Sequence, residues 1–402
     1  MTNEATLSFI RKNRKEAPER LAFRGHPEGV DMRYALEQIA GWQAACRKLP
    51  EWADVDGIVF PPHISMEQCS SQPTAIYKRG IATRLLGDKA DTFVDLTGGY
   101  GVDFSYIARA FRHGVYVERL EVLCNAARHN FPLLGIDGAD VVCVDGTEYL
   151  KSIEHVSMIY LDPARRDSNG GRTYGIADCT PDIMGMKGTL TAKADWLMIK
   201  LSPMLDWHKT VEDIGNVSEV HIISVRNECK ELLLVVNCSG DVQHEPNVFC
   251  ANCTDDSGMT TVDEFCREGS SGAVSPTFAD PEEQLYLYEP NASIMKAGIF
   301  GQLCRKYVVS QIAPSSNLFV SDKLVEGFPG RHFRIETVSG MNRKELHKNL
   351  GSIDKANITT RNFPLSVAEL RKRLKLKDGG NTYIFATTLQ DGSHKLLVCM
   401  RE

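Results

Sequence analysis

The stretch FVDLTGGYGVDFSYIA, residues 93–108, joins two apolar runs through a turn with three glycines in four positions. The first run is short and rich in β-branched and aromatic residues, whereas the second has the length of a helix. A glycine-rich turn between a strand and a helix lets a ligand approach the backbone closely, because side chains are kept away. Such a turn alone is a weak signal, so its neighbours decide what it binds.

Short apolar runs alternate with segments of helical length from about residue 70 to residue 240. This pattern predicts an α/β fold with a parallel sheet covered on both faces. The expected parallel strands are TFVDLT, GVYVER, ADVVCVD, SMIYLDPA and ADWLMIKLSP. Two further runs, EVHIISV and KELLLVV, are joined by the turn-like RNEC and are expected to form an antiparallel pair at the end of the sheet.

The rest of the chain divides by composition and periodicity. We predict an N-terminal helical region at 1–70, an α/β domain at 71–240, and a loop or linker at 241–275 that is rich in Gly, Ser, Thr and Asp. Two modules of mixed strands and helices follow at 276–328 and 329–402.

Composition favours a cytoplasmic protein. The N-terminus lacks the apolar core of a signal peptide, and no stretch of about 20 apolar residues is present. The twelve cysteines are scattered, so we expect reduced thiols. Cys250 and Cys253 have the spacing of metal ligands, with His244 and Cys266 nearby in sequence, but a second close pair is missing. We therefore expect no metal site, with zinc as the minor alternative.

Charge is distributed unevenly along the chain. Residues 331–402 hold 14 Lys and Arg against 7 Asp and Glu, whereas the preceding residues hold 32 against 45. A basic end is explained either by a solvated surface or by a module that binds nucleic acid.

Two carboxylates flank the glycine turn. Asp95 ends the strand before Gly98, Gly99 and Gly101, and Glu118 ends the next strand about 20 residues later. A carboxylate at this second position can accept both hydroxyls of a ribose. A dinucleotide such as NAD and S-adenosylmethionine both fit this arrangement.

Other residues argue against the dinucleotide. Phe104 stands where a third glycine is wanted, and Asp95 would repel a pyrophosphate but suits the ammonium of a methionine moiety. Asp145 and Asp162 follow the next two strands, and Asp145 is placed to meet an adenine amino group. Four acids at the carboxyl ends of successive strands are expected to line one crevice.

Residues 70–240 resemble class I S-adenosylmethionine-dependent methyltransferases. VDLTGGYGVD is similar to their first motif, VYVER to the second, VDGTEYL to the third and LDPARRD to the fourth. The resemblance implies a Rossmann-like seven-stranded domain and S-adenosylmethionine as the cofactor. It implies cofactor contacts from Asp95, Thr97, Gly98, Gly99, Gly101, Glu118, Arg119, Asp145, Gly146 and Asp162.

A narrower resemblance is to methyltransferases that carry a THUMP-like domain. LDPARRD is followed by GGR and DCTPDI, and an α+β region ends the chain. This resemblance implies a ferredoxin-like domain at 276–328 and a THUMP-like domain at 329–402. Because THUMP domains bind RNA, it implies tRNA or rRNA as the partner; the sequence predicts no oligomeric state.

The fourth motif departs from its usual form in nucleobase amino-methyltransferases, which is Asp/Asn-Pro-Pro-aromatic. Here it reads Asp162-Pro163-Ala164-Arg165, so the acid and the first proline remain but the stacking ring is absent. The candidate catalytic residues are Asp162, Pro163 and Arg165, and Tyr174 is a candidate for the missing ring. An adenine N6 target is thereby less favoured, and guanine N2, another amine or a non-nucleic substrate stays open.

The roles of several residues near this motif can be interpreted in two ways. Cys179 is expected to be a packed thiol rather than a nucleophile. Arg165, Arg166 and Arg172 are equally suited to phosphate contacts and to salt bridges with Asp167 and Asp178. Lys200 and Trp207 are expected to border the mouth of the substrate site.

Three functions follow from these residues. The first is methyl transfer to an RNA base amine, the second is methyl transfer to a protein or small molecule, and the third is an inactive protein that binds the cofactor. The presence of Asp95, Glu118 and Asp162 argues against the third.

Overall fold

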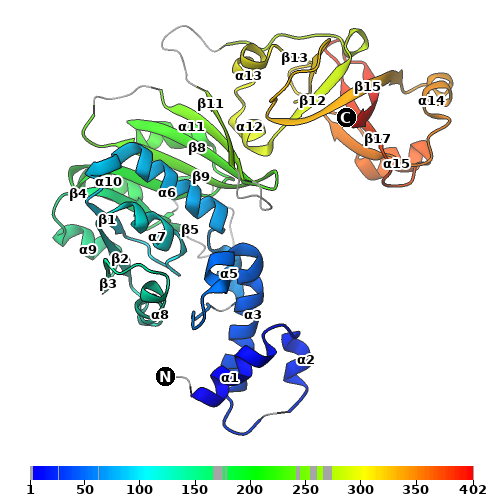
Figure 1. Cartoon of the computed structure of the whole chain (residues 1–402). Coiled ribbons are helices and arrows are strands. Elements are labelled where there is room, and N and C mark those ends of the chain that lie inside the picture. Colours follow the sequence, from blue (N-terminus) through cyan, green and yellow to red (C-terminus); the bar gives the residue numbers. More distant parts are fainter. Residues whose placement is uncertain are drawn as a thin grey trace. The chain divides into compact units, whose positions relative to one another are not determined.

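The computed structural model describes residues 3–25, 27–61, 63–165, 175–176, 179–240, 245–253, 260–265 and 274–401. The chain divides into two compact units (Figure 1). The first comprises Met1–Arg226, Lys230–Pro246 and Cys253–Thr260, and the second comprises Asn227–Cys229, Asn247–Asn252 and Thr261–Glu402.

The N-terminal part of the first unit is helical. Its helices are α1 (Glu4–Asn13), α2 (Pro18–Ala22), α3 (Met32–Lys48), α4 (Pro50–Asp54), α5 (His63–Gln68) and α6 (Gln72–Leu86). Asn3 and Asp31 cap α1 and α3, because their side chains accept hydrogen bonds from backbone N–H groups of the first turn. This part is tied to the α/β domain, since Val59 exchanges two hydrogen bonds of 2.9 Å with the side chain of Asn130.

A nine-stranded sheet has the order β11-β10-β8-β9-β7-β4-β1-β2-β3. Its strands are β1 (Thr92–Asp95), β2 (His113–Glu118), β3 (Ala139–Cys143), β4 (Val156–Leu161), β7 (Ala194–Leu201), β8 (Val217–Val225), β9 (Glu228–Asn237), β10 (Asn247–Cys253) and β11 (Thr260–Phe265). Strands β3, β2, β1, β4 and β7 are parallel neighbours, and β9 is antiparallel to β7. Every residue of β4 is buried, so both faces of the sheet are covered there, as the sequence predicts.

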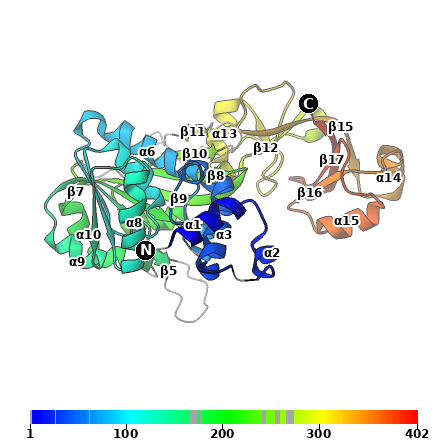
Figure 2. The same ribbon diagram turned by 60° about the horizontal axis from the view of Figure 1, so that its bottom comes forward.

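Helices lie on both sides of this sheet (Figure 2). They are α7 (Val102–Ile107), α8 (Glu121–Leu133), α9 (Gly146–Ser152), α10 (Ile183–Ala192) and α11 (Trp207–Ile214), together with α6. A separate two-stranded sheet pairs β5 (Ala164–Arg165) with β6 (Cys179–Thr180). The seven strands from β3 to β8 form the Rossmann-like sheet that the motif resemblance implies.

Two expectations about the edge of this sheet are wrong. Strand β9 lies between β7 and β8, and β10 and β11 continue the sheet beyond β8, so the β8–β9 pair does not end it. The segment expected as a loop at 241–275 contains both added strands. The reason is local: five of the seven residues of β10 are buried, but turn-forming residues on either side obscured this apolar run.

The second unit contains a seven-stranded sheet of order β13-β14-β12-β15-β18-β17-β16. Its elements are β12 (Tyr286–Pro290), α12 (Ala292–Ala297), α13 (Phe300–Tyr307), β13 (Ser310–Gln311), β14 (Phe319–Ser321), β15 (Gly330–Gly340), α14 (Arg343–Leu350), β16 (Asn357–Arg361), α15 (Val367–Leu374), β17 (Thr382–Thr388) and β18 (His394–Arg401). One core cluster places Leu287 and Val320 against Phe333, Phe385 and Leu397. The two C-terminal modules expected from the sequence therefore share one sheet and one core.

Helices α14 and α15 pack on the opposite face of the same strands. Leu350 and Leu370 from these helices lie in one cluster with Ile384, Leu396 and Val398 of the sheet. Both helices consequently expose their polar sides in the same direction.

No helix in the described ranges is long and apolar enough to cross a lipid bilayer. The described cysteines are free thiols. Cys250 and Cys253 are buried in β10, while His244 and Cys266 lie outside the described residues. The part of the chain that the structure covers contains no group of three or more His, Cys, Asp or Glu suited to hold a metal ion.

Candidate cofactor and acceptor site

A cavity of about 520 Å³ lies where the parallel strands of the first unit end. Its size is typical of a small-molecule site, and its position is where open α/β sheets bind ligands. The four predicted acids line it: Asp95 from the end of β1, Glu118 from the end of β2, Asp145 after β3 and Asp162 after β4. The structure thus brings together carboxylates that are up to 67 positions apart in the sequence.

The glycines of the turn make room for the protein's own aromatic rings. A Cβ atom on Gly98 would lie 2.3 Å from the ring of Tyr116, and one on Gly101 would lie 2.8 Å from the ring of Phe131. Gly101 also has a φ of +73°, which disfavours other residues. Internal packing, and not only ligand approach, therefore requires glycine here.

The backbone N–H groups of this turn are used within the protein. Gly98 N donates to Val117 O at 2.9 Å, and Gly99 N donates to Glu118 Oε2 at 3.0 Å. The sequence predicts that a ligand approaches the backbone of this turn, but the N–H groups of these two glycines already have partners within the protein. Their hydrogen bonds fix Glu118 beside the turn, and both glycines still line the cavity.

Asp95 is a buried carboxyl group whose Oδ1 is held by its neighbour Thr97. Its Oδ1 accepts hydrogen bonds from Thr97 N at 2.9 Å and from Thr97 Oγ1 at 3.3 Å. Burial raises the pKa of Asp95 to about 8, and the nearby carboxylates of Asp103 and Asp162 contribute to this rise. The hydrogen bonds from Thr97 act in the opposite direction and lower the pKa. A cation placed against Asp95 would therefore be strongly stabilising for its charged form.

Glu118 is held in place by two backbone donors. Besides Gly99 N, Leu120 N donates to its Oε1 at 2.9 Å. Each carboxylate oxygen keeps further lone-pair capacity, so the group can also accept hydrogen bonds from a ligand. Arg119, the next residue, is exposed and also lines the cavity.

Asp145 caps helix α9. Its Oδ1 accepts from Thr147 N at 2.8 Å and from Thr147 Oγ1 at 2.6 Å, and these bonds lower its pKa. At Gly146, an added Cβ would lie 2.1 Å from the carbonyl oxygen of Leu96, so only glycine allows α9 to begin this close to the first motif.

Asp162 also lines the cavity, close enough to Asp95 for its charge to contribute to the raised pKa of Asp95. The backbone N–H of Asp162 donates to Thr97 Oγ1 at 2.7 Å, and its Oδ2 is 2.5 Å from Lys200 Nζ. Pro163 is buried and does not line the cavity, and Arg165 pairs through its backbone with Cys179. The side chain of Arg165 lies outside the described part of the structure.

Of the neighbouring residues, Lys200 lines the cavity, as the sequence predicts. Trp207 is buried at the start of α11 and Cys179 is buried in β6, and neither lines the cavity. Arg166, Arg172 and Tyr174 lie outside the described residues.

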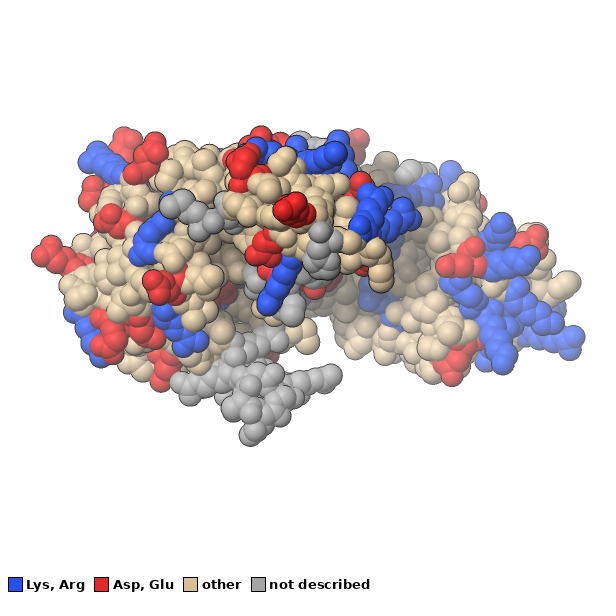
Figure 3. All heavy atoms as spheres, turned by 90° about the horizontal axis from the view of Figure 1, so that it is seen from below, with Lys and Arg blue, Asp and Glu red and all other residues tan. Residues whose placement is uncertain are grey.

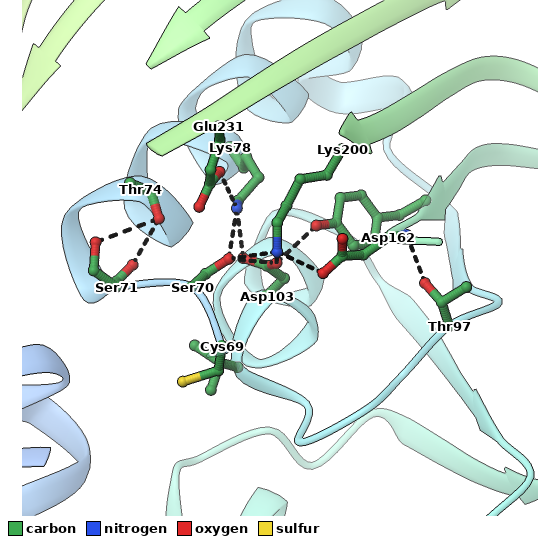
Figure 4. Close-up of polar contacts among 12 residues, drawn as sticks. Cys69, Ser70, Ser71, Thr74, Lys78, Thr97, Asp103, Asp162, Lys200 and Glu231 are labelled. Atoms are coloured by element: carbon green, nitrogen blue, oxygen red, sulfur yellow. Dashed lines mark hydrogen bonds and ion pairs between the residues drawn. The ribbon is translucent and has the colours of Figure 1, made fainter. Parts of the chain in front are cut away.

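Sequence reasoning missed an ion network beneath the site (Figure 4). Lys78 on α6 is fully buried, with Nζ 2.8 Å from Asp103 Oδ1 and 2.7 Å from Glu231 Oε2. The sequence does contain a signal for this network, because Lys78 lies three positions after Ala75 and three before Ile81 and so falls on the buried face of helix α6. A charge at such a position requires a buried partner of opposite sign.

Comparisons with known proteins agree with this architecture. A family model described as THUMP domain-like matches residues 330–401, and one described as a ferredoxin-like domain matches residues 286–329. A search of curated proteins gave no match.

Among solved structures, a proposed methyltransferase from Porphyromonas gingivalis W83 is 30% identical, with a TM-score of 0.85, over 100% of this chain and 99% of that chain. A SAM-dependent methyltransferase from Agrobacterium tumefaciens is 15% identical over 41% of this chain and 61% of its own, with a TM-score of 0.32. The TrmK protein of M. capricolum, solved with S-adenosyl-homocysteine, is 12% identical over 42% of this chain and 71% of its own, also at 0.32.

The full-length match and the two domain matches agree with the cavity at the ends of the parallel strands. The donor set also fits the cofactor, because a positively charged methionine moiety and a ribose suit the carboxylates of Asp95 and Glu118. The chain therefore belongs to the class I methyltransferases with C-terminal ferredoxin-like and THUMP-like domains, and it is an enzyme that uses S-adenosylmethionine.

Proposed function

We propose that this enzyme methylates an amine on an RNA base, in tRNA or rRNA. The observation that carries the proposal is the carboxylate of Asp162, which lines the cofactor cavity while Lys200 holds only one of its two oxygens. The proposal places the catalytic part of the chain within 71–240 and the protein in the cytoplasm, where such RNAs occur.

In this proposal the acids at the strand ends bind the cofactor. Asp95 accepts the ammonium of the methionine moiety, Glu118 the ribose hydroxyls and Asp145 the adenine amino group. Thr97 orients Asp95 through two hydrogen bonds and Asp162 through a third. In this proposal one threonine therefore couples the cofactor-binding Asp95 to the acceptor-binding Asp162.

The bound cofactor supplies an electrophilic methyl group on a sulfonium sulfur. The acceptor nitrogen forms the N–CH₃ bond as the S–CH₃ bond breaks, and the electron pair of the S–CH₃ bond stays on sulfur. The nitrogen then gives up one proton to the carboxylate of Asp162, which passes it to solvent. Asp162 accepts a hydrogen bond from the amine, which aims the nitrogen lone pair at the methyl group and stabilises the developing positive charge. Positioning of this kind supplies most of the acceleration in an in-line displacement.

A cationic surface in the second unit supports RNA as the substrate class. Figure 3 shows Lys and Arg gathered over the THUMP-like part of the chain. Exposed members of this surface are Arg343, Lys344 and Lys348 on α14, Lys372 and Arg373 on α15, and Lys375 and Lys377 just after it. Arg371 is different, because it pairs with Asp378 at 2.6 Å. Both helices expose their polar sides in the same direction, so these cations can contact one phosphate backbone.

Two measurements test the proposal. Nucleosides from cells with and without the gene are compared by mass spectrometry, and a methylated base that disappears with the gene supports an RNA substrate. Methyl transfer to that RNA should be abolished in Asp162→Ala, with cofactor affinity within a few-fold of the wild type. Loss of both together would make Asp162 a cofactor ligand and remove the main support for an amine acceptor.

RNA binding is tested separately by gel shift at two salt concentrations. Lys372→Glu with Arg373→Glu should weaken binding and reduce the salt slope by about one unit for each phosphate that the variant no longer neutralises. The matched control is Lys12→Glu with Lys15→Glu, two exposed lysines of the helical N-terminal region. Wild-type protein without salt-sensitive RNA binding would instead favour a protein or small-molecule substrate.

A further inference from the structure

Two lysines and three carboxylates form a continuous network from Asp162 in the wall of the cavity to the buried side chains of Lys78 and Glu231 (Figure 4). Lys200 on β7 joins Asp162 to this network, with Nζ 2.5 Å from Asp162 Oδ2, 3.1 Å from Ser70 Oγ and 3.5 Å from Asp103 Oδ2. An ammonium has three N–H donors, so these contacts occupy all of them. Lys200 accordingly has no donor left for a substrate.

Lys78 anchors the network from beneath in the same way. Its Nζ contacts Asp103, Glu231 and Ser70, the last at 2.9 Å. Ser70 Oγ in turn donates to Asp103 Oδ2 at 2.7 Å and accepts from both lysines. Its single O–H and both lone pairs are thereby used, so the hydroxyl fixes the separation of the two ammonium groups.

The network keeps Lys200 charged. Although burial opposes it, the carboxylates of Asp162 and Asp103 hold the pKa of Lys200 well above its usual range. A protonated lysine has no lone pair with which to take a proton from the acceptor. Lys200 is therefore excluded as the general base, and its contact with Asp162 needs another explanation.

We propose that Lys200 is a positioning residue for methyl transfer, which fixes the carboxylate of Asp162 through Oδ2 and leaves Oδ1 to accept the acceptor amine. The inference rests on the proposed function for the role of the amine. The network also fixes the position of Lys200 relative to Asp162, because Lys200 contacts Asp103 and Asp103 is itself held by Lys78, Ser70 and Tyr160.

The charge of Asp162 depends on this contact. Burial raises the pKa of Asp162, whereas Lys200 lowers it, so replacing Lys200 with a neutral residue raises it further. An opposite charge at this distance typically lowers the pKa of a carboxyl group by about 1–3 units. Among the residues that the structure describes, the titratable groups around Asp162 are Lys200, Asp103, Lys78, Asp95, Tyr160 and Glu231.

The test measures the titration of Asp162 directly, in full-length protein with ¹³C-labelled aspartate carboxyl groups. Asp162→Asn assigns the signal. We expect Lys200→Met to raise the titration midpoint of Asp162 by about 1–3 pH units and Lys200→Arg to restore most of the difference. The control is Lys209→Met, which removes an exposed lysine of α11. An unchanged or lowered midpoint in Lys200→Met overturns the inference, whether or not RNA proves to be the substrate.

Methyl transfer gives the second readout. In Lys200→Met, the acidic limb of the rate against pH should move upward by the same interval, with cofactor affinity within a few-fold. In an Asp162→Asn background, Lys200→Met should have little further effect, because a residue that acts through Asp162 has nothing left to fix. Equal rate losses at every pH and in both backgrounds would show a merely structural role. If Lys200→Met fails to fold, Lys200→Gln, which retains a donor without the charge, takes its place in both experiments.

Discussion

Replacing Gly98 with alanine tests whether the turn of the first motif is held by internal packing. Gly98 lies outside the left-handed φ region, so the backbone itself accepts alanine and only the added Cβ matters. That atom would lie 2.3, 2.6 and 2.7 Å from three carbon atoms of the Tyr116 ring. Ordinary carbon contacts are about 3.5–4.0 Å, so the ring or the turn must move by more than about 1 Å.

The ring of Tyr116 has little freedom to move. It is fully buried, meets Phe104 and Phe131 edge-on at centroid distances of 5.7 and 5.4 Å, and donates its hydroxyl to Gly99 O. Overpacking of such a site typically costs about 1–3 kcal/mol. Because the turn also carries the N–H that fixes Glu118, we expect cofactor affinity to fall at least about tenfold together with stability.

The assay combines thermal unfolding with calorimetric titration of S-adenosylhomocysteine. Gly80→Ala is the matched control, because Gly80 is exposed in the interior of α6 with nothing within 4 Å of its added Cβ. That substitution should stabilise the protein by about 0.5–1 kcal/mol and leave binding unchanged. A Gly98→Ala protein with wild-type stability and affinity would refute the packing explanation of the glycine turn.

Three further outcomes follow from the same contacts. Glu118→Ala should weaken cofactor binding by about 1.5–3 kcal/mol through loss of charge-assisted hydrogen bonds, whereas Glu121→Ala, at an exposed position on α8, should not. If calorimetric titrations give the same cofactor affinity for both variants, Glu118 is not a cofactor ligand. Because the pKa of Asp95 is raised to about 8, its carboxyl group is protonated in the free protein at neutral pH. Affinity for a cationic cofactor should therefore rise by up to about tenfold per pH unit between pH 6 and 7.5, with proton release seen by calorimetry in different buffers. Asp95→Asn should abolish this pH dependence, and proton uptake on binding would contradict it. Glu289→Ala removes the carboxylate that pairs with both Arg331 and Arg361, two partly exposed arginines, and should destabilise the second unit by about 1–3 kcal/mol in calorimetry. Glu283→Ala, at an exposed site, should have no effect. No loss of stability in Glu289→Ala would show that these ion pairs do not hold the two modules together.

Much of the α/β domain is predictable because its signals are local. The alternation of short apolar runs with helical segments gives the parallel strands, and the four acids follow those strands directly in the sequence. Once the strands are placed, their carboxyl ends must share one edge of the sheet, which brings Asp95 and Asp162 together without any further information.

The ion network could not be derived in this way, because its members come from parts of the chain with no local relation. Ser70 precedes α6, Lys200 lies on β7 and Glu231 on β9, and periodicity gives no reason to place them side by side. Each is ordinary alone; only the sheet order, in which β9 is inserted next to β7, puts the carboxylate of Glu231 within reach of Lys78. The wrong expectation for the β8–β9 pair and the missed network therefore have one cause. If the β8–β9 pair is expected at the end of the sheet, Glu231 is not expected near the site. Lys78 is then expected as a charged residue on the buried face of α6 with no partner of opposite charge.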